Sequence, residues 1–194
     1  MAYPASVSVE TPERVANWRP LLHWLMAIPH IIITAVLSYV SQIVGLISWF
    51  IILFTGRLPS GLAGLQVLYL RYNTRVNAYV GFLHEQYPPF SFEMTAEEPG
   101  GTPVTVSFEP QLDDRNRLTT LVRLILAIPA FIFSVIVGLI SLVCHVLGFF
   151  AVLFTGRWPG GLRNWIVSVL GVELRLSAYM TLLTDEYPPF SLDA

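Results

Sequence analysis

Few residue types in this chain could do chemistry, and the histidines are the first to consider. There are four, His23, His30, His84 and His145, and a pair of histidines on membrane helices is a typical haem ligand set. The repeat described below places residue 130 at the position of His30. His145 lies fifteen residues further on, which separates the two histidines by about 22 Å along parallel helices at ~1.5 Å per residue. His23 and His84 form at best a chance pair, so we expect no haem, no other cofactor and no metal site.

Nucleophilic catalysis is not expected either, because it needs a serine or cysteine beside a base that an acid orients. The only cysteine, Cys144, lies in the apolar run LISLVCHVLGFF and is expected to pack as a small apolar side chain. The adjacent carboxylates Asp113–Asp114 and Asp185–Glu186 point in different directions, so we expect solvated loop residues. The sequence therefore predicts that the protein is not an enzyme.

One set of charged residues does suggest a specific contact. Residues 62–85 and 162–184 each have an apolar stripe at helical spacing and a more polar opposite side, which is typical of an amphipathic helix. The second segment carries a carboxylate near its centre, which would be costly in a membrane if unpaired. We predict that Glu173 pairs with Arg75, or failing that with Arg71, across a twofold axis. The candidate intramembrane polar network is Arg71, Arg75, Glu173 and Arg175.

The elements that must position these residues occur twice. Three phrases return one hundred positions later: LFTGR (53–57 and 153–157), YPPFS (87–91 and 187–191) and AIPH, as AIPA (27–30 and 127–130). Residues 7–91 thus correspond to 106–191 after a one-residue adjustment. We predict a first membrane repeat over 1–92, an acidic Gly/Pro linker over 93–103 and a second membrane repeat over 104–194.

The composition favours a lipid environment. Apolar residues make up 54% of the chain, charged residues 12%, and the mean hydropathy is +0.62, whereas soluble domains carry about 25% charged residues. The net charge is −2 and the basic residues are all arginine, with no basic run, so no nucleic-acid partner is expected. The first twenty residues lack the basic and apolar regions of a signal peptide, so we expect the mature helices to drive insertion.

Each repeat contains one long apolar run, at 21–54 and at 121–154. A single helix of that length would reach roughly 50 Å, well beyond the hydrocarbon core of about 30 Å. Pro29 and Pro129 would divide each run into a stretch at the interface and a tilted or kinked span.

The amphipathic segments can either cross the membrane or lie flat at its surface. Crossing gives both repeats the same orientation, which explains why their motifs stay alike, so crossing is preferred. The predicted fold is an all-α integral membrane protein of two tandem repeats with two helices each. It would have four spans, a parallel pseudo-twofold along the membrane normal and short extramembrane β segments at 7–10 and 104–109.

The LFTGR phrase is predicted to mark the point where a helix leaves the membrane. Gly56 and Gly156 would cap the helix, and Arg57 and Arg157 would meet the helix dipole and lipid phosphates. The spacing of a phosphate-binding catalytic loop is lacking. Aromatic residues near the helix ends are expected to act as interfacial anchors, namely Trp18, Trp24, Trp49, Tyr87, Trp158 and Tyr187.

Together, the paired AIPH, LFTGR.P.GL, R..AY and YPPFSL elements resemble a bacterial, mainly actinobacterial, integral-membrane family that is classed as a domain of unknown function. The resemblance covers nearly the whole chain twice, as a tandem duplication. It implies a multi-pass protein of the bacterial cell (inner) membrane with no assigned activity, cofactor or catalytic residue. Ala130 replaces the histidine of the second AIPH phrase, which argues against an essential symmetric role for His30.

Two functions are compatible with these features. The first is a non-enzymatic membrane module, an accessory subunit of a larger complex or a self-associating scaffold, whose partners are lipids and other membrane subunits. Gly45, Gly138 and Gly148 would allow its helices to pack closely. The alternative is a small oligomeric transporter, channel or lipid-handling protein that uses the arginine-lined faces of 62–85 and 162–184.

The distribution of arginines predicts the orientation. Five lie on the side of the termini and three on the other side, which favours cytoplasmic termini under the positive-inside rule. The first group is Arg14, Arg19, Arg115, Arg117 and Arg123, and the second is Arg57, Arg157 and Arg163.

Overall fold

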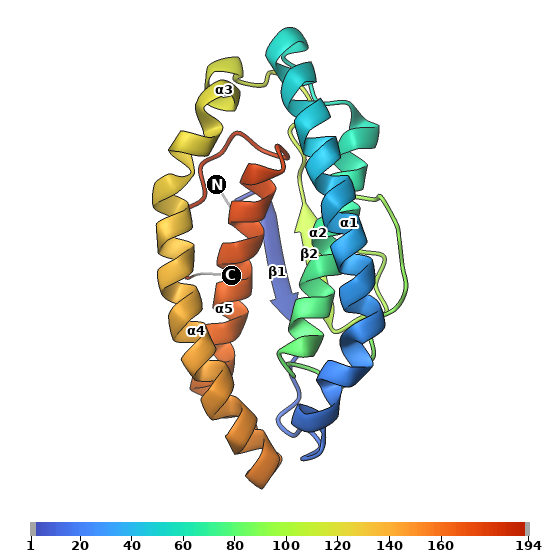
Figure 1. The fold of residues 1–194 in the computed structure, drawn as a ribbon, viewed down its shortest axis with the longest axis vertical. Coiled ribbons are helices and arrows are strands. Elements are labelled where there is room, and N and C mark those ends of the chain that lie inside the picture. The colour runs from blue at the N-terminus through green and yellow to red at the C-terminus, as the bar shows by residue number, and fades with distance from the viewer. Residues whose placement is uncertain (1–2, 193–194) are drawn as a thin grey trace.

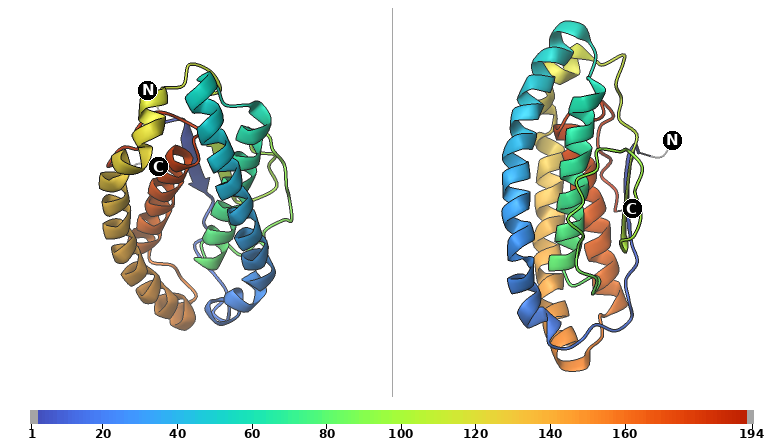
Figure 2. Two further views of the ribbon diagram at one scale, coloured as in Figure 1. Left: turned by 45° about the horizontal axis from the view of Figure 1, so that its top comes forward. Right: turned by 90° about the vertical axis from the view of Figure 1, so that its right-hand side faces the viewer.

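Two helical hairpins and a two-stranded sheet form three layers (Figures 1 and 2). The computed structural model describes residues 3–192, so the outermost residues of both predicted repeats lie outside it. The elements are β1 (Ala5–Val9), α1 (Arg19–Thr55), α2 (Ser60–Val80), β2 (Val104–Phe108), α3 (Arg117–Leu126), α4 (Ile128–Thr155) and α5 (Gly160–Met180). The helices α1 and α4 form one outer layer, α2 and α5 the middle layer, and the sheet with the linker the other outer layer.

The long apolar runs form the long helices, as predicted. α1 has 37 residues and continues through Pro29, whereas the second copy is divided at Ala127 into α3 and α4. Both runs end at a glycine in the left-handed conformation, with φ of 70° at Gly56 and 66° at Gly156. Only glycine adopts this conformation readily, which is why it ends helices.

The amphipathic helices α2 and α5 end earlier than predicted, and they end in the same way. The helix stops at residues 80 and 180, and then Phe82 and Leu182 adopt φ values of 51° and 68°. Such values are uncommon outside glycine. Both side chains are buried, and the next residue, Leu83 or Leu183, donates a backbone hydrogen bond into the last helical turn. Packing therefore fixes a turn that the residue types alone do not favour.

The sheet reveals the symmetry of the molecule. β1 and β2 pair antiparallel, and Val7 lies opposite Val106, its equivalent in the repeat. A pseudo-twofold axis therefore passes between these two residues, perpendicular to the sheet. The inward valines Val7, Val104 and Val106 are buried and Val9 is half-buried, while the outward side chains are all exposed hydroxyls, Ser6, Ser8, Thr105 and Ser107. The predicted β segments are confirmed, and the inward face joins the core with α2 and α5.

The corresponding helices of the two repeats run in opposite directions. The backbone N–H of Val15 donates to the carbonyl of Gly156, and that of Arg115 donates to the carbonyl of Gly56, each at 3.0 Å. Because Val15 precedes α1 and Gly156 ends α4, the start of one long helix lies beside the end of the other (Figure 1). The predicted parallel arrangement of spans is therefore wrong. The pseudo-twofold is perpendicular to the helices instead.

The number of helices suited to crossing a membrane is smaller than predicted. Within the described residues, α1 and α4 are long and apolar enough to span, by length and composition. α2 and α5 do not meet that criterion, so the prediction of four spans is not supported. The mostly helical architecture and the tandem layout of the two repeats agree with the sequence analysis.

Candidate functional site

The predicted contact between Glu173 and the arginines of α2 is not formed. Arg71 Nε lies 3.3 Å from Glu98 Oε2, and Arg75 pairs with the other oxygen of the same carboxylate. Arg71 also donates to four linker carbonyls, those of Glu93, Thr95, Ala96 and Glu97. The linker folds back over α2 and supplies a carboxylate that is 7% exposed. Glu98 is therefore a buried acid that the sequence analysis did not single out.

The equivalent arginines Arg75 and Arg175 each hold the extended segment that follows their own helix. Arg175 Nη2 donates to the carbonyl of Ser191 at 2.7 Å. Arg75 Nη1 donates to the hydroxyl of Ser91 at 3.5 Å. Ser91 and Ser191 end the two YPPFS phrases. Arg75 and Arg175 therefore bind the repeated motifs to their helices and do not line a path between helices.

Glu173 lies instead at the junction of two cavities. It is exposed to the cavity space and faces the α2 side of the molecule with Asn77. Within residues 3–192 it forms no ion pair. The surrounding apolar side chains remove water and raise the pKa of Glu173 above its usual value. Its carboxylate is thus a hydrogen-bond acceptor that is accessible from the cavities and forms no ion pair with a described residue.

The smaller of these cavities is polar and lies where α2 meets α5. Its volume is about 180 Å³. Its lining includes four repeat-equivalent pairs, Leu70 with Leu170, Asn73 with Glu173, Thr74 with Leu174 and Asn77 with Ser177, together with Leu176 and with Ser134 of α4. Glu173 and polar residues of α2 thus line one cavity between the repeats, although the arginines of the predicted network take no part in it.

Two larger, mainly apolar cavities adjoin the central one. Their volumes are about 560 and 590 Å³. They share Glu173, Asn77 or Ser177 with the central cavity. The two are copies of each other, because their linings include the repeat-equivalent pairs Ser41 and Ser141, Trp49 and Phe149, Leu46 and Val146, and Leu182 and Phe82. The duplication therefore explains why a mainly apolar cavity lies on each side of the more polar central cavity.

A buried ionic cluster was missed by the sequence analysis. Asp185 Oδ1 accepts hydrogen bonds from Arg115, at 2.7 Å, and from Arg123, and Oδ2 accepts from the backbone N–H of Asn116. Asp185 is therefore not the solvated loop residue that was expected, although Glu186, Asp113 and Asp114 are exposed. Burial opposes its ionisation, but the hydrogen bonds from Arg115 and Asn116 and the charges of both arginines outweigh burial and hold the pKa of Asp185 below its usual value.

The first repeat carries a weaker version of that cluster. Glu85 occupies the position of Asp185 and pairs with Arg19 at 3.5 Å. His23 occupies the position of Arg123, and each of these side chains contacts the backbone carbonyl of the equivalent tyrosine, Tyr79 or Tyr179. An acid at the same place in both repeats, directly after an amphipathic helix, was the available signal.

The LFTGR motif joins the two repeats. Gly56 and Gly156 cap their helices as predicted, and their carbonyls accept the cross-repeat hydrogen bonds described above. Arg57 is exposed and forms an ion pair with Asp113 at 3.1 Å. Arg157 forms an isolated antiparallel bridge with Arg14 through the backbone. Contact of either arginine with lipid phosphate stays a prediction.

The predicted aromatic anchors fall into two groups. Trp18, Trp24, Tyr87 and Tyr187 are exposed, and Trp49 is half-buried. Trp158 is buried, and its indole N–H donates to the carbonyl of Phe82 at 2.9 Å, so its prediction as an interfacial anchor is wrong. Its ring lies against Gly148, where a Cβ would overlap it.

Two of the four histidines, His23 and His84, lie beside the same tyrosine, Tyr79, and the other two lie apart on α1 and α4. His30 Nδ1 lies 2.6 Å from the Tyr72 hydroxyl, and its ring stacks on Phe90. His145 Nδ1 lies 2.9 Å from the carbonyl of Ser141, while His84 is buried beside Tyr79. In the part of the chain that the structure describes, no three or more histidine, cysteine or acidic residues form a group that could hold a metal ion.

Comparison with known proteins gives one match. The sequence profile of a family described as "Domain of unknown function (DUF4389)" matches residues 17–91 and again 117–191. The two matches confirm the tandem duplication. No curated protein and no solved structure matches the chain.

Proposed function

The chain belongs to the DUF4389 family of domains of unknown function, and from its own geometry we propose that it is a non-enzymatic membrane module that lies flat in one leaflet. Its location would be the cytoplasmic leaflet of the bacterial cell membrane. The observation that carries this proposal is the opposite character of the two outer layers, with an apolar layer of α1 and α4 on one side and a polar layer of sheet and linker on the other.

The apolar layer supports contact with lipid. α1 carries no charged residue between Arg19 and Arg57, and α4 carries none at all. Large apolar side chains are exposed along both helices, including Leu25 at 64%, Ile43 at 60% and Leu139 at 61%. A contiguous apolar surface of this extent is typical of an interaction face rather than of a solvated one.

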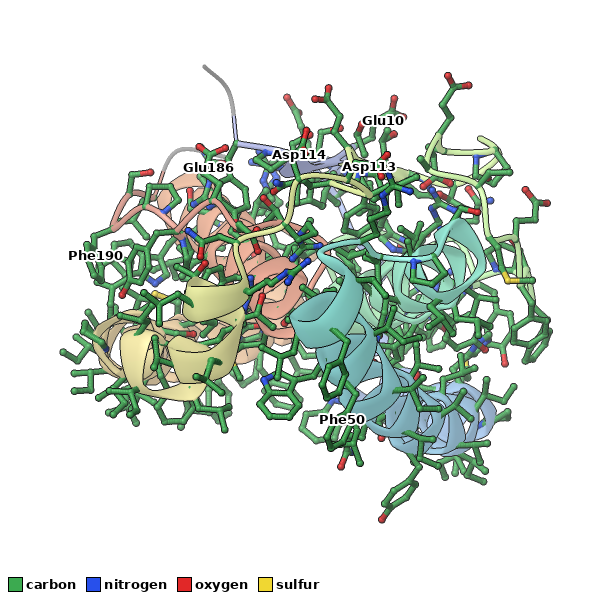
Figure 3. The ribbon with its side chains drawn as sticks, turned by 90° about the horizontal axis from the view of Figure 1, so that it is seen from above. Glu10, Phe50, Asp113, Asp114, Glu186 and Phe190 are labelled. Carbon is green, nitrogen blue, oxygen red and sulfur yellow. The ribbon has the colours of Figure 1, made fainter. Side chains whose placement is uncertain are left out.

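The opposite layer supports contact with water. Figure 3, a view along the helices, places Phe50 at one edge of the molecule and Glu10, Asp113, Asp114 and Glu186 at the opposite edge. The outward side chains of the sheet are the exposed hydroxyls described above. Exposed charged and hydroxyl groups favour water, because hydrocarbon offers them no hydrogen-bond partner.

The path of the linker argues against a spanning orientation. After α2 the chain returns along the length of the helices, through the linker and β2, to reach the start of α3 (Figures 1 and 2). If α1 and α4 crossed the bilayer, this extended segment, with the exposed Glu93 and Glu97, would cross it too. Two paired strands have open edges, and lipid-exposed open edges do not occur within the hydrocarbon region.

The flat orientation also accounts for the similarity of the repeats. The pseudo-twofold is perpendicular to the layers, so in this orientation it coincides with the membrane normal. Both copies of each motif then lie at the same depth. The length of α1, about 55 Å at ~1.5 Å per residue, exceeds a hydrocarbon core of about 30 Å but is unrestricted within the membrane plane.

The structure gives no support to a transport path lined by arginine, because Arg71 and Arg75 bind the linker. The cavities between the repeats favour lipid handling as the second candidate function. An accessory role would in addition require other membrane subunits to bind, and we propose the polar layer as the surface that they contact.

Labelling of introduced cysteines tests the orientation. In a Cys144→Ala background, Ser8→Cys, Arg57→Cys and Arg157→Cys place a thiol on the sheet and at the two opposite ends of the molecule. We expect a membrane-impermeant maleimide to label all three in inverted membrane vesicles and none in intact spheroplasts. Labelling of the two ends from opposite sides, with Ser8→Cys protected, would overturn the proposal in favour of spanning helices.

A further inference from the structure

The three cavities between the repeats adjoin through shared lining residues, and together they are called the groove below. We propose that this groove binds a two-chain lipid with an uncharged hydroxyl head, the head at Glu173 and one chain in each lateral cavity. This inference rests on the proposed function, because the groove must open towards lipid. The chemical class of the ligand follows from the lining, the charge and the size of each part.

The mouths of the lateral cavities lie on the lipid side. Val146 and Phe150 line one cavity and Leu46 lines the other, and each of them is about half exposed or more on the apolar layer. A chain from the surrounding leaflet can therefore enter each cavity without crossing a polar surface. Volumes of about 560 and 590 Å³ lie within the range of small-molecule sites.

The duplication explains why there are two chains. The lateral cavities occupy repeat-equivalent places on either side of the pseudo-twofold, and the polar cavity lies on the axis between them. A lipid with two chains joined at one head has the same arrangement. A one-chain lipid would leave one of the two cavities without an occupant.

The polar centre selects the head. The Glu173 carboxylate accepts hydrogen bonds and repels anions. In the adjoining cavity, His145 directs Nδ1 to the carbonyl of Ser141, so Nδ1 carries the proton and Nε2 is an acceptor. A head that donates hydrogen bonds and carries no negative charge fits these acceptors. The central volume of about 180 Å³ equals roughly six waters at ~30 Å³ each, which is room for a glycerol hydroxyl head.

Native mass spectrometry in detergent with two probes of identical chains tests the head. Dioleoylglycerol presents a hydroxyl and dioleoyl phosphatidate presents an anion. We expect one dioleoylglycerol per chain and at least about tenfold weaker retention of the phosphatidate, since like charges in contact cost several kcal/mol. Glu173→Gln should reduce this preference to less than about threefold. Equal retention of both lipids by the unaltered protein would overturn the assignment of the head.

Tryptophan substitutions test the chains. Val146→Trp and Leu46→Trp fill the mouths of the two lateral cavities at equivalent positions. Val143→Trp and Ile43→Trp add the same bulk to exposed positions of α4 and α1 that do not line the cavities. We expect the first pair to weaken dioleoylglycerol retention at least about tenfold and the second pair to leave it unchanged. The same loss in all four variants, or in none, would mean association with the detergent belt and would overturn the groove.

The proposed orientation can fail separately from the groove. Flotation of the protein and all variants with phosphatidylcholine vesicles reports membrane attachment, and binding in detergent does not depend on it. Protein that floats but retains no dioleoylglycerol would overturn the groove alone. Protein that retains dioleoylglycerol yet fails to float would overturn the proposed function.

Discussion

Removing the charge of Asp185 should destabilise the protein far more than removing that of its counterpart in the first repeat. The side chains of Arg115, Arg123 and Asp185 are 0%, 3% and 13% exposed. Asp185→Asn leaves both arginines enclosed without an anion, and breaking a buried pair in this way costs about 3–5 kcal/mol. Glu85 is 39% exposed and Arg19 is 16% exposed. Glu85→Gln should therefore cost only about 1–2 kcal/mol, because the hydrogen bond from the Ala16 N–H then goes to a neutral amide oxygen instead of a carboxylate.

Thermal unfolding in one detergent, followed by circular dichroism, measures the difference. For a chain of this size, 1 kcal/mol corresponds to a shift in Tm of about 2–4 °C. We therefore expect a decrease of roughly 10 °C for Asp185→Asn and of only a few degrees for Glu85→Gln. The two variants make matched chemical changes at equivalent positions, so equal decreases would refute the argument that enclosure of the cluster sets the cost.

Three further predictions concern packing, pH and exposure to lipid. Gly148→Ala should destabilise the protein by about 1–3 kcal/mol, because the added Cβ would overlap the Trp158 ring. Gly138→Ala on the same helix should be neutral or stabilising, because its Cβ would have no atom within 4 Å. Guanidinium unfolding in detergent compares the stabilities of the two variants. Burial lowers the pKa of His84 from 6.5 to about 4, helped by the charges of His23 and Arg19. The contribution of the neutral His84 to stability is therefore complete above about pH 6.5 and declines as the pH falls towards 4. His84→Leu should flatten the decline of Tm with falling pH over this range. Brominated lipid should quench the fluorescence of a variant that retains only Trp24, which is 58% exposed, and spare one that retains only Trp158, which is 5% exposed.

Much of the local structure could be predicted from the sequence because it depends on short-range patterns. The one-hundred-residue offset revealed the duplication, the apolar runs gave α1 and α4, and alternation gave the two strands. The amphipathic stripes gave α2 and α5. Each of these inferences uses residues that are neighbours in sequence or a directly repeated phrase, and none of them requires knowledge of the path of the whole chain.

The three-dimensional relation of the repeats was not predictable by the same reasoning. The crossing model assumed that equal environments for the two copies require parallel spans, but a twofold perpendicular to the helices satisfies the same condition. The pairing of Arg75 with Glu173 failed because Glu98 of the linker lies closer, and no sequence pattern sets where a linker folds. Trp158 was predicted as an anchor because of its residue type alone. Its equivalent in the first repeat is Leu58, an aliphatic residue that is also buried, and this apolar equivalent is more typical of a core position than of an interfacial anchor.

The orientation of the long helices tests the account most directly. Polarised attenuated total reflection infrared spectroscopy of the protein in aligned phosphatidylcholine bilayers measures the mean angle between the helix axes and the membrane normal through the dichroism of the amide I band. All the long helices run nearly along one axis (Figure 1), so their dichroism adds. A module lying flat in one leaflet predicts helix axes close to the membrane plane. A mean angle of about 20° from the normal, the average for transmembrane helices, would contradict the account.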